Sequence, residues 1–113
     1  MIDTNLRGLI TMSKLMIPFF LKNANGHIIN VGSIAGHHVY PYGNIYCATK
    51  SAVHPMTEAL RYDLLGKGIR VSEISPGMVN TNFSTIRLGD RQKAERVYAG
   101  MQPLTARDVA EGI

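Results

Sequence analysis

The segment HIINVGS, residues 27–33, is a short apolar run that ends in a glycine and a serine. A continuous run of this length predicts a strand buried on both faces, as is typical of parallel sheets. A second run of the same kind, IRVSEIS at residues 69–75, predicts another strand. These two segments decide the fold class, and the rest of the chain is interpreted by how it connects them.

Helical patterns precede and separate the two predicted strands. Apolar residues recur near a 3.6-residue period over residues 1–26, which predicts a helix that Asn25-Gly26 ends. A second helix is expected over residues 42–65. Pro55 should bend it, because proline removes one backbone hydrogen bond, and the glycines just after residue 65 should stop it.

The part that follows the second strand is more polar. Residues 76–84 are expected to be a loop, residues 84–100 to be partly helical, and residues 105–113 to form a helix capped by Thr105. Alternating helices and strands predict an α/β fold, part of a doubly wound, Rossmann-like parallel sheet. Two apolar edge strands make a poor sheet, so we expect an incomplete one, with residues 1–113 as a portion of one larger domain.

Composition argues against several classes of function. The net charge is +4, but the basic residues are dispersed, so no nucleic-acid partner is expected. The longest apolar stretch, LMIPFFL, is too short to cross a bilayer, and no signal peptide or membrane partner is predicted. Cys47 is the only cysteine, which suits a reducing compartment, and a cytoplasmic location is expected.

The adjacent histidines His37 and His38 raise the question of a metal site. No cysteine or further histidine stands nearby at the spacing of metal ligands. The sequence therefore predicts ordinary loop histidines and no metal, and it predicts that His54 packs on a helix surface.

The segment NIYCATK, residues 44–50, carries a tyrosine and a lysine four residues apart. On a helix, Tyr46 and Lys50 would share one face, and a nearby cation favours the phenolate over the phenol. Such a tyrosine can exchange a proton with an alcohol or carbonyl oxygen. Alone, the pair is more simply a surface pair. Ser33 and Pro76-Gly77, each at the end of a predicted strand where ligands bind in parallel sheets, favour a catalytic site.

These motifs together resemble a known family. NVGSIAG, YCATK and ISPGMVNT closely resemble the short-chain dehydrogenase/reductase family, and the resemblance covers essentially the whole chain. Within it, MIDTN-x-x-G, YCATK and PGMV-x-T-x-FS are most similar to the NADP-dependent 3-hydroxy acid (serine-type) dehydrogenases. The resemblance implies an oxidoreductase that interconverts a secondary alcohol and a ketone, with a small 3-hydroxy acid as substrate. It implies NADP as cofactor, with NAD as the alternative.

The resemblance also implies roles for individual residues. Tyr46 would be the general acid and base, Lys50 would favour its ionised form and bind the nicotinamide ribose, and Ser33 would orient the substrate oxygen. Asn5 would hold a water that relays protons. Arg87 would pair with a substrate carboxylate. The residues expected to bind the cofactor are Tyr46, Lys50, Pro76, Gly77, Val79 and Thr81.

Residues 1–113 depart from the family pattern in two ways. They have no counterpart of its glycine-rich dinucleotide turn or of its last strand, so we expect a fragment, the catalytic central-to-late portion of the domain, inactive by itself. Tyr42 stands where close relatives often have glycine, so a crowded loop is expected there.

The full-length form is expected to act on a small molecule as a homodimer or homotetramer. A truncated, non-catalytic remnant that acts as a subunit-association module is the alternative. The sequence leaves open the exact substrate, the cofactor preference and the direction of the reaction.

Overall fold

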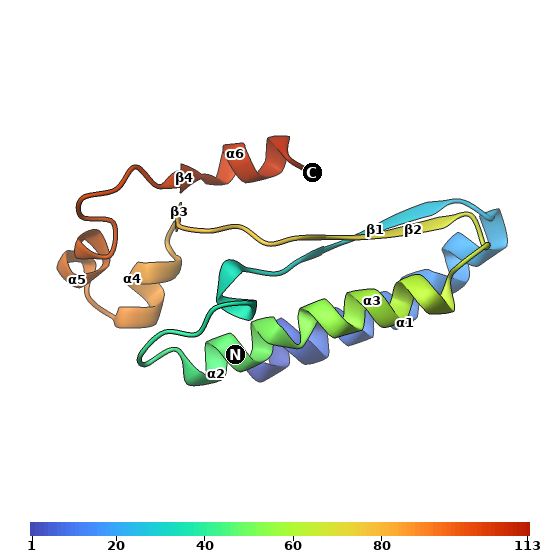
Figure 1. Cartoon of the computed structure of the whole chain (residues 1–113), viewed down its shortest axis with the longest axis horizontal. Coiled ribbons are helices and arrows are strands. Elements are labelled where there is room, and N and C mark those ends of the chain that lie inside the picture. Colours follow the sequence, from blue (N-terminus) through green and yellow to red (C-terminus); the bar gives the residue numbers. More distant parts are fainter. The chain divides into compact units, whose positions relative to one another are not determined.

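The structure is a computed structural model that describes residues 1–113, in two compact units, Met1–Ser75 and Pro76–Ile113 (Figure 1). The first unit holds both of the long predicted strands, and the second holds short helices and strands. None of the helices combines the length and apolar character needed to span a membrane. That residues 1–113 form part of a single domain stays a prediction.

The first unit is built on two parallel strands, β1 (Gly26–Val31) and β2 (Ile69–Ile74). They pair in register from Gly26 opposite Ile69 to Val31 opposite Ile74. A parallel pair needs a crossover connection, and helices supply it here. The predicted strands and the predicted α/β class are therefore confirmed, with strand ends that differ by one or two residues.

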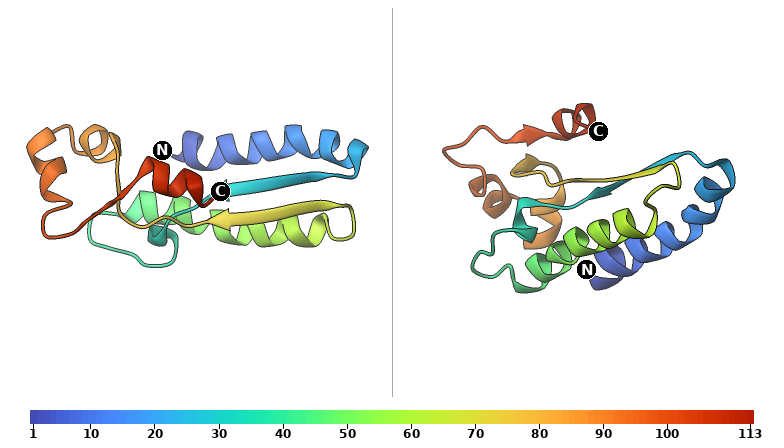
Figure 2. Two further views of the ribbon diagram at one scale, coloured as in Figure 1. Left: turned by 90° about the horizontal axis from the view of Figure 1, so that it is seen from above. Right: turned by 45° about the vertical axis from the view of Figure 1, so that its right-hand side comes forward.

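Two helices, α1 (Gly8–Asn23) and α3 (Val53–Asp63), lie on the same face of this strand pair (Figures 1 and 2). Helix α1 packs on β1, and α3 packs mainly on β2. The core between them holds seven apolar side chains: Ile17, Phe20, Ile28, Leu60, Leu64, Ile69 and Val71. Most of β1 is only partly buried. The prediction of burial on both faces is wrong for this unit, because both helices cover the same face.

The first helix begins in a wider turn than expected. Residues Asp3–Arg7 form a π-helical turn, η1, that leads directly into α1. Helix α1 continues through Pro18 and ends at Asn23. Ala24 caps it, with a φ of 46° in the left-handed region. The end predicted at Asn25-Gly26 is thus correct to within two residues.

The second predicted helix is divided in two. Helix α2 (Asn44–Ser51) and α3 are separated by a turn at Ala52. Pro55 has no N–H to donate to the carbonyl of Ser51, four residues earlier, so the break falls where that hydrogen bond is missing. Gly66 and Gly68 then take positive φ angles of 74° and 72° and reverse the chain toward β2. The structure therefore shows an interruption of the helix near Pro55, and it confirms the predicted end.

The second unit contains a feature that the sequence did not predict. Strand β3 (Val79–Asn80), which lies in the segment expected to be loop, pairs in parallel with β4 (Leu104–Thr105) just before the last helix. Helices α4 (Phe83–Leu88) and α5 (Arg91–Arg96) fill the segment predicted to be partly helical. Helix α6 (Ala106–Glu111) begins with the predicted Thr105 cap, which forms a reciprocal capping box with Asp108.

Candidate active site

Helix α2 carries the tyrosine and the lysine that the sequence singled out. Tyr46 and Lys50 are both half-buried and stand one helical turn apart, so they share a face. The helix begins tightly: a Cβ on Gly43 would lie 2.6 Å from the ring of Tyr40 and 2.9 Å from the sulfur of Cys47. Close packing at this turn therefore fixes where α2 begins.

The Lys50 side chain reaches the end of β1. Its Nζ donates a hydrogen bond to the carbonyl of Val31, the last residue of that strand, at 2.9 Å. Burial lowers the pKa of the Lys50 ammonium below its usual value, and the negative charge of Glu73 offsets part of this effect. The ammonium group thus lies beside the strand end, two residues before Ser33.

Ser33 is held in a fixed orientation just after β1. Its Oγ accepts the N–H of Ala35 at 3.1 Å and so caps the short 3₁₀ turn η2 (Ile34–Gly36), and the residue is 9% exposed. This turn packs on α2: a Cβ on Gly36 would lie 2.7 Å from the carbonyl oxygen of Lys50. Ser51 also donates to the Gly36 carbonyl at 2.8 Å. The serine turn and the lysine turn are therefore in direct contact.

Asn5 is linked to the same helix through a residue that the sequence did not single out. The Asn5 Nδ2 donates to Thr49 Oγ1 at 3.2 Å, and that hydroxyl donates to the carbonyl of Tyr46 at 2.9 Å. Thr49 is 4% exposed. It lies between Tyr46 and Lys50 in YCATK, but its partner is 44 residues away, so sequence spacing gave no signal for this contact.

Within Met1–Ser75, Asn5 is therefore linked to the helix of Tyr46 through Thr49, and Lys50 reaches the end of β1. The turn that begins at Ser33 packs on the same helix. A fixed hydroxyl, a phenol on α2 and a half-buried ammonium are groups suited to binding and protonating a carbonyl oxygen.

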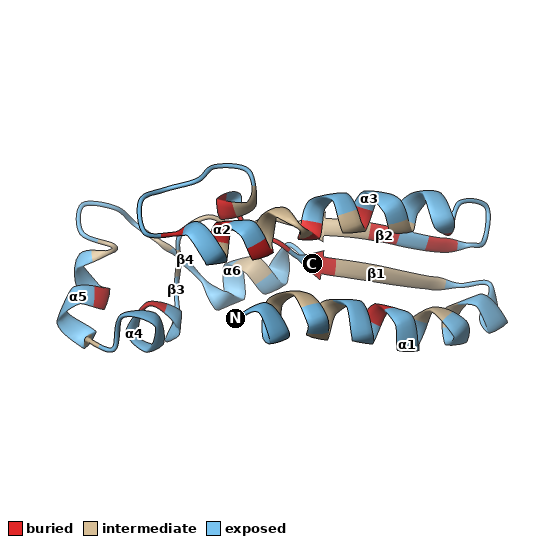
Figure 3. Cartoon of the chain, turned by 90° about the horizontal axis from the view of Figure 1, so that it is seen from below, coloured by how far each residue is buried: buried red, intermediate tan, exposed pale blue.

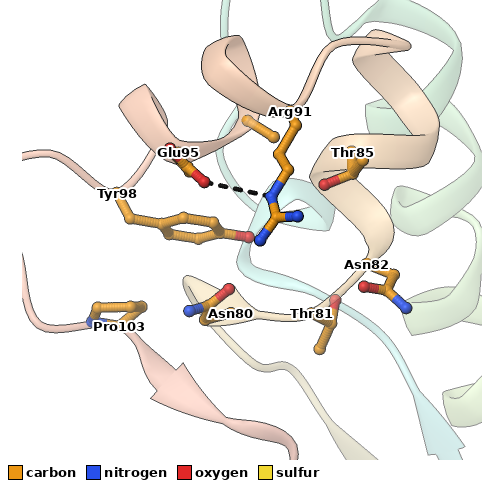
Figure 4. Close-up of a pocket in the computed structure, with 9 residues that line it drawn as sticks. Asn80, Thr81, Asn82, Thr85, Arg91, Glu95, Tyr98 and Pro103 are labelled. Carbon is orange, nitrogen blue, oxygen red and sulfur yellow. Dashed lines mark ion pairs between the residues drawn. The ribbon is translucent and has the colours of Figure 1, made fainter.

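The other predicted site residues, Pro76, Gly77, Val79, Thr81 and Arg87, belong to the second unit. Thr81 Oγ1 accepts the N–H of Phe83 at 3.2 Å, and Thr81 lines a polar depression of about 680 Å³ within this unit (Figure 4). Arg87 is exposed on α4 and is not among the residues that line this depression.

Arg91, four residues later in sequence and the first residue of α5, lines the depression instead. It forms an ion pair with Glu95 at 3.4 Å, drawn as the dashed line in Figure 4. The sequence signal that favoured Arg87, a guanidinium in a polar segment after the second strand, applies equally to Arg91.

Comparisons with known proteins agree with this arrangement. The family model described as short chain dehydrogenase matches residues 1–91. The NADP-dependent 3-hydroxy acid dehydrogenase of Schizosaccharomyces pombe is 46% identical over 114 residues, which cover 100% of this chain and 44% of the relative. The serine 3-dehydrogenase of Agrobacterium fabrum is 40% identical over 114 residues, which cover 100% of this chain and 45% of the relative.

A solved structure is also closely similar. The closed form of serine dehydrogenase complexed with NADP+ has a TM-score of 0.95 and 45% sequence identity, over 99% of this chain and 46% of that one. The chain therefore spans less than half the length of the relatives it matches. On the match over residues 1–91, and with the Ser33, Tyr46 and Lys50 motifs at the strand end and on α2, the chain belongs to the short-chain dehydrogenase family.

Proposed function

We propose that these residues serve an NADP-dependent oxidoreductase that interconverts a secondary alcohol and a ketone, with a small 3-hydroxy acid as substrate. The observation that supports this most is the contact between the two turns that carry Ser33 and Lys50, on the same helix as Tyr46. The names of the similar proteins support the cofactor and the substrate class.

In the proposed reaction, Tyr46 transfers the proton. In the reductive direction its hydroxyl gives a proton to the carbonyl oxygen of the substrate, and in the oxidative direction the phenolate removes one from the alcohol. The Lys50 ammonium favours the phenolate through its positive charge. Ser33 Oγ already accepts the Ala35 N–H, so its own O–H remains to donate to the substrate oxygen.

Asn5 is proposed to hold a water that carries protons between solvent and this site. Its side-chain amide is fixed by Thr49, which is in turn bonded to the backbone at Tyr46. A water bound by Asn5 would therefore keep a constant position relative to the helix that carries the tyrosine.

The hydrogen-bond donors of the candidate site suit the binding of a nicotinamide nucleotide. The Lys50 ammonium has three N–H donors and uses one on Val31, which leaves two for ribose hydroxyls. Pro76, Gly77, Val79 and Thr81 are proposed to contact the nicotinamide end. When bound, this cofactor would supply or accept the hydride, and the protein supplies position and the proton.

Recognition of a substrate carboxylate is proposed for Arg87. In an active protein, Arg87→Ala should raise KM for hydroxy acids far more than KM for uncharged alcohols, because the bidentate pair with the carboxylate is lost. Arg91→Ala is the matched comparison, since Arg91 is the nearby guanidinium that lines the polar depression. A larger effect of Arg91→Ala would transfer the assignment to that residue.

A chimera tests the proposed function directly. Residues 1–113 would replace the matching 114-residue segment of the S. pombe relative, and the product would be assayed for NADP+ reduction with 3-hydroxy acids. The chimera should be active, and Tyr46→Phe should lower kcat by roughly 10²–10⁴-fold, the usual contribution of general acid–base catalysis. Tyr42→Phe, at a tyrosine just outside α2, is the control and should keep the activity.

Two results would contradict this function. One is a correctly folded chimera, verified by circular dichroism and gel filtration, that shows no NADP-dependent activity. The other is equal activity in the Tyr46→Phe and Tyr42→Phe chimeras. For the 113-residue chain alone we expect no activity and weak cofactor binding, and micromolar binding in an NADPH fluorescence titration would refute that part.

A specific observation favours a second candidate, an association module. Met12, Leu15, Met16 and Phe19 recur at helical spacing and form an exposed apolar stripe on α1. Figure 3 shows that much of helix α1 is exposed. Such a stripe suits pairing with a second copy of the chain, whether or not the site is active. We propose a homodimer or homotetramer for the full-length form on this ground.

A further inference from the structure

A group of nitrogen and oxygen ligands has no role in the proposed reaction. His37 follows η2, His54 stands in the first turn of α3, and Glu73 is on β2. The two imidazoles and the carboxylate each offer one ligand atom, and these three atoms lie within 4.8 Å of one another. All three residues belong to Met1–Ser75.

Each histidine nitrogen lies at a distance from the Glu73 carboxylate that a shared metal ion requires. His54 Nδ1 lies 3.1 Å from Glu73 Oε2, and His37 Nε2 lies 3.8 Å from Glu73 Oε1. Ligands bound to Zn²⁺ at about 2.0–2.1 Å in a tetrahedron stand roughly 3.3 Å apart. The two distances go to different oxygens of the same carboxylate, and rotation of the exposed imidazoles would bring one atom from each of the three residues to that spacing.

The carboxylate at the centre is already fixed in place. The Glu73 side chain is only 8% exposed, whereas the two histidines are accessible from solvent. Ser75 Oγ donates to Glu73 Oε1 at 2.6 Å, and His54 Nε2 faces Glu58 Oε2 at 3.8 Å. Hydrogen bonds to a ligating carboxylate and a carboxylate behind a ligating histidine are the usual supports around protein metal ions.

The chemistry of the ligands selects the kind of ion. Two imidazoles and one carboxylate suit Zn²⁺ and similar divalent transition metals, whereas Mg²⁺ prefers oxygen ligands alone. The single negative charge of the carboxylate would be offset by the ion. Access from solvent at the histidines leaves a path for the ion to enter and room for a water as a fourth ligand.

We propose that His37, His54 and Glu73 form a binding site for one divalent transition-metal ion of the zinc type, which fastens the loop after η2 to α3 and β2. The sequence predicted no metal because the ligands stand 17 and 19 residues apart along the chain, and only the packing of the η2 loop, α3 and β2 brings them together. The proposal does not rest on the proposed dehydrogenase activity, although Glu73 also acts on Lys50 through its charge.

Titration of the 113-residue chain with Zn²⁺ by isothermal calorimetry tests the site. One ion should bind per chain with micromolar or tighter affinity, and Zn²⁺ should raise Tm, because an ion that binds only the folded state stabilises it. Co²⁺ should give the visible absorption of a tetrahedral nitrogen–oxygen site. Mg²⁺ should not compete.

Matched variants separate this site from adventitious binding by exposed histidines. His37→Ala and His54→Ala should each weaken Zn²⁺ binding by at least roughly tenfold and abolish the rise in Tm, and Glu73→Gln, which keeps the shape of the side chain, should do the same. His38→Ala is the control, since it removes an adjacent exposed histidine outside the group. Both histidine substitutions are at accessible positions, so circular dichroism should remain unchanged.

The proposal is overturned if the folded chain binds no Zn²⁺ at micromolar concentration. It is also overturned if His38→Ala weakens binding as much as His37→Ala does, or if the Glu73→Gln chain keeps the affinity of the wild type. In any of these cases the two histidines would only contact the Glu73 carboxylate and would not bind a metal ion with it.

Discussion

At the scale of single residues, Tyr42 holds the chain in an unfavourable backbone conformation. Its φ is 64° and its side chain is 97% exposed. The left-handed region costs a residue with a Cβ roughly 1–2 kcal/mol, and glycine is relieved of most of that cost. Since glycine also raises the entropy of the unfolded chain, Tyr42→Gly should raise the free energy of unfolding by about 0.5–1 kcal/mol net.

Urea unfolding followed by circular dichroism measures this effect. Tyr42→Ala is the matched control, because alanine removes the ring but keeps the backbone penalty. Equal stabilities of the glycine and alanine variants would show that the ring, and not φ, determines the energy at this position.

Lys50 should make stability depend on pH in a defined direction. Its pKa in the folded chain is below the usual 10.5, chiefly through burial. Between these two pKa values the unfolded chain binds more protons at this residue, so the contribution of Lys50 to stability increases as pH rises toward 10.5. The difference in unfolding free energy between wild type and Lys50→Met should therefore shift in favour of the wild type on going from pH 7 to pH 10.

Lys14→Met provides the comparison for this experiment, because Lys14 is exposed on α1. If the Lys14 and Lys50 variants show the same pH trend, general charge effects and not the burial of Lys50 are responsible.

The candidate site illustrates what sequence spacing can and cannot give. Tyr46 and Lys50 were found because one helical turn relates them, and Ser33 because strand ends collect ligands. Thr49 was missed because its partner Asn5 is 44 residues away, and the pairing of His54 with Glu73 was missed for the same reason at 19 residues. Only tertiary packing creates such contacts.

At the scale of elements, the N-terminus of α6 provides a test of local stability. Thr105 Oγ1 accepts the N–H of Asp108, and the Asp108 carboxylate accepts the N–H of Thr105. Removing such a cap costs about 1 kcal/mol, so Thr105→Ala should speed hydrogen exchange in the first turn of α6 several-fold. Thr105→Ser keeps the acceptor and should leave exchange nearly unchanged, whereas equal exchange in both variants would contradict a role for the cap.

The capping carboxylate adds a pH dependence to the same helix. Hydrogen bonds from Thr105 lower the pKa of Asp108 below its usual value of 3.8. A depressed carboxyl pKa contributes stability above the unfolded value, and this stability is lost as pH falls through the folded pKa. The protection of α6 against exchange should therefore decrease below about pH 4, and the decrease should be smaller in Asp108→Asn.

Elements with strong local signals were predicted well, and those that depend on partners were not. Apolar runs located β1 and β2, and the Thr105 signal located α6. Strands β3 and β4 have two residues each, too few for any periodic pattern. The exposure of one face of β1 was not predicted, because a run of apolar residues does not indicate whether helices pack on one face of the strand or on both.

At the scale of the whole molecule, the apolar stripe on α1 should govern association. Met12, Leu15, Met16 and Phe19 are all exposed, and burying such side chains between two copies would stabilise a dimer by roughly 25 cal/mol per Å² before the costs of association. Phe19→Glu should therefore shift the chain toward monomer by at least about tenfold in dimer dissociation constant, as measured by sedimentation equilibrium. Lys22→Glu, a charge change near the end of the same helix, should have little effect.

If wild type and Phe19→Glu sediment identically as monomers, the stripe does not mediate association of this chain. Association that persists in Phe19→Glu would instead place the contact on another surface.

The packing around the start of α2 gives the chain a built-in reporter. Cys47 is the single cysteine, is 2% exposed, and lies against the Gly43 turn directly after Tyr46. A thiol reagent such as DTNB can modify it only when that turn opens, so the modification rate measures how often the start of α2 opens. The native thiol can therefore report, without an engineered label, how a ligand, a metal ion or a substitution lowers the rate of local opening at this turn.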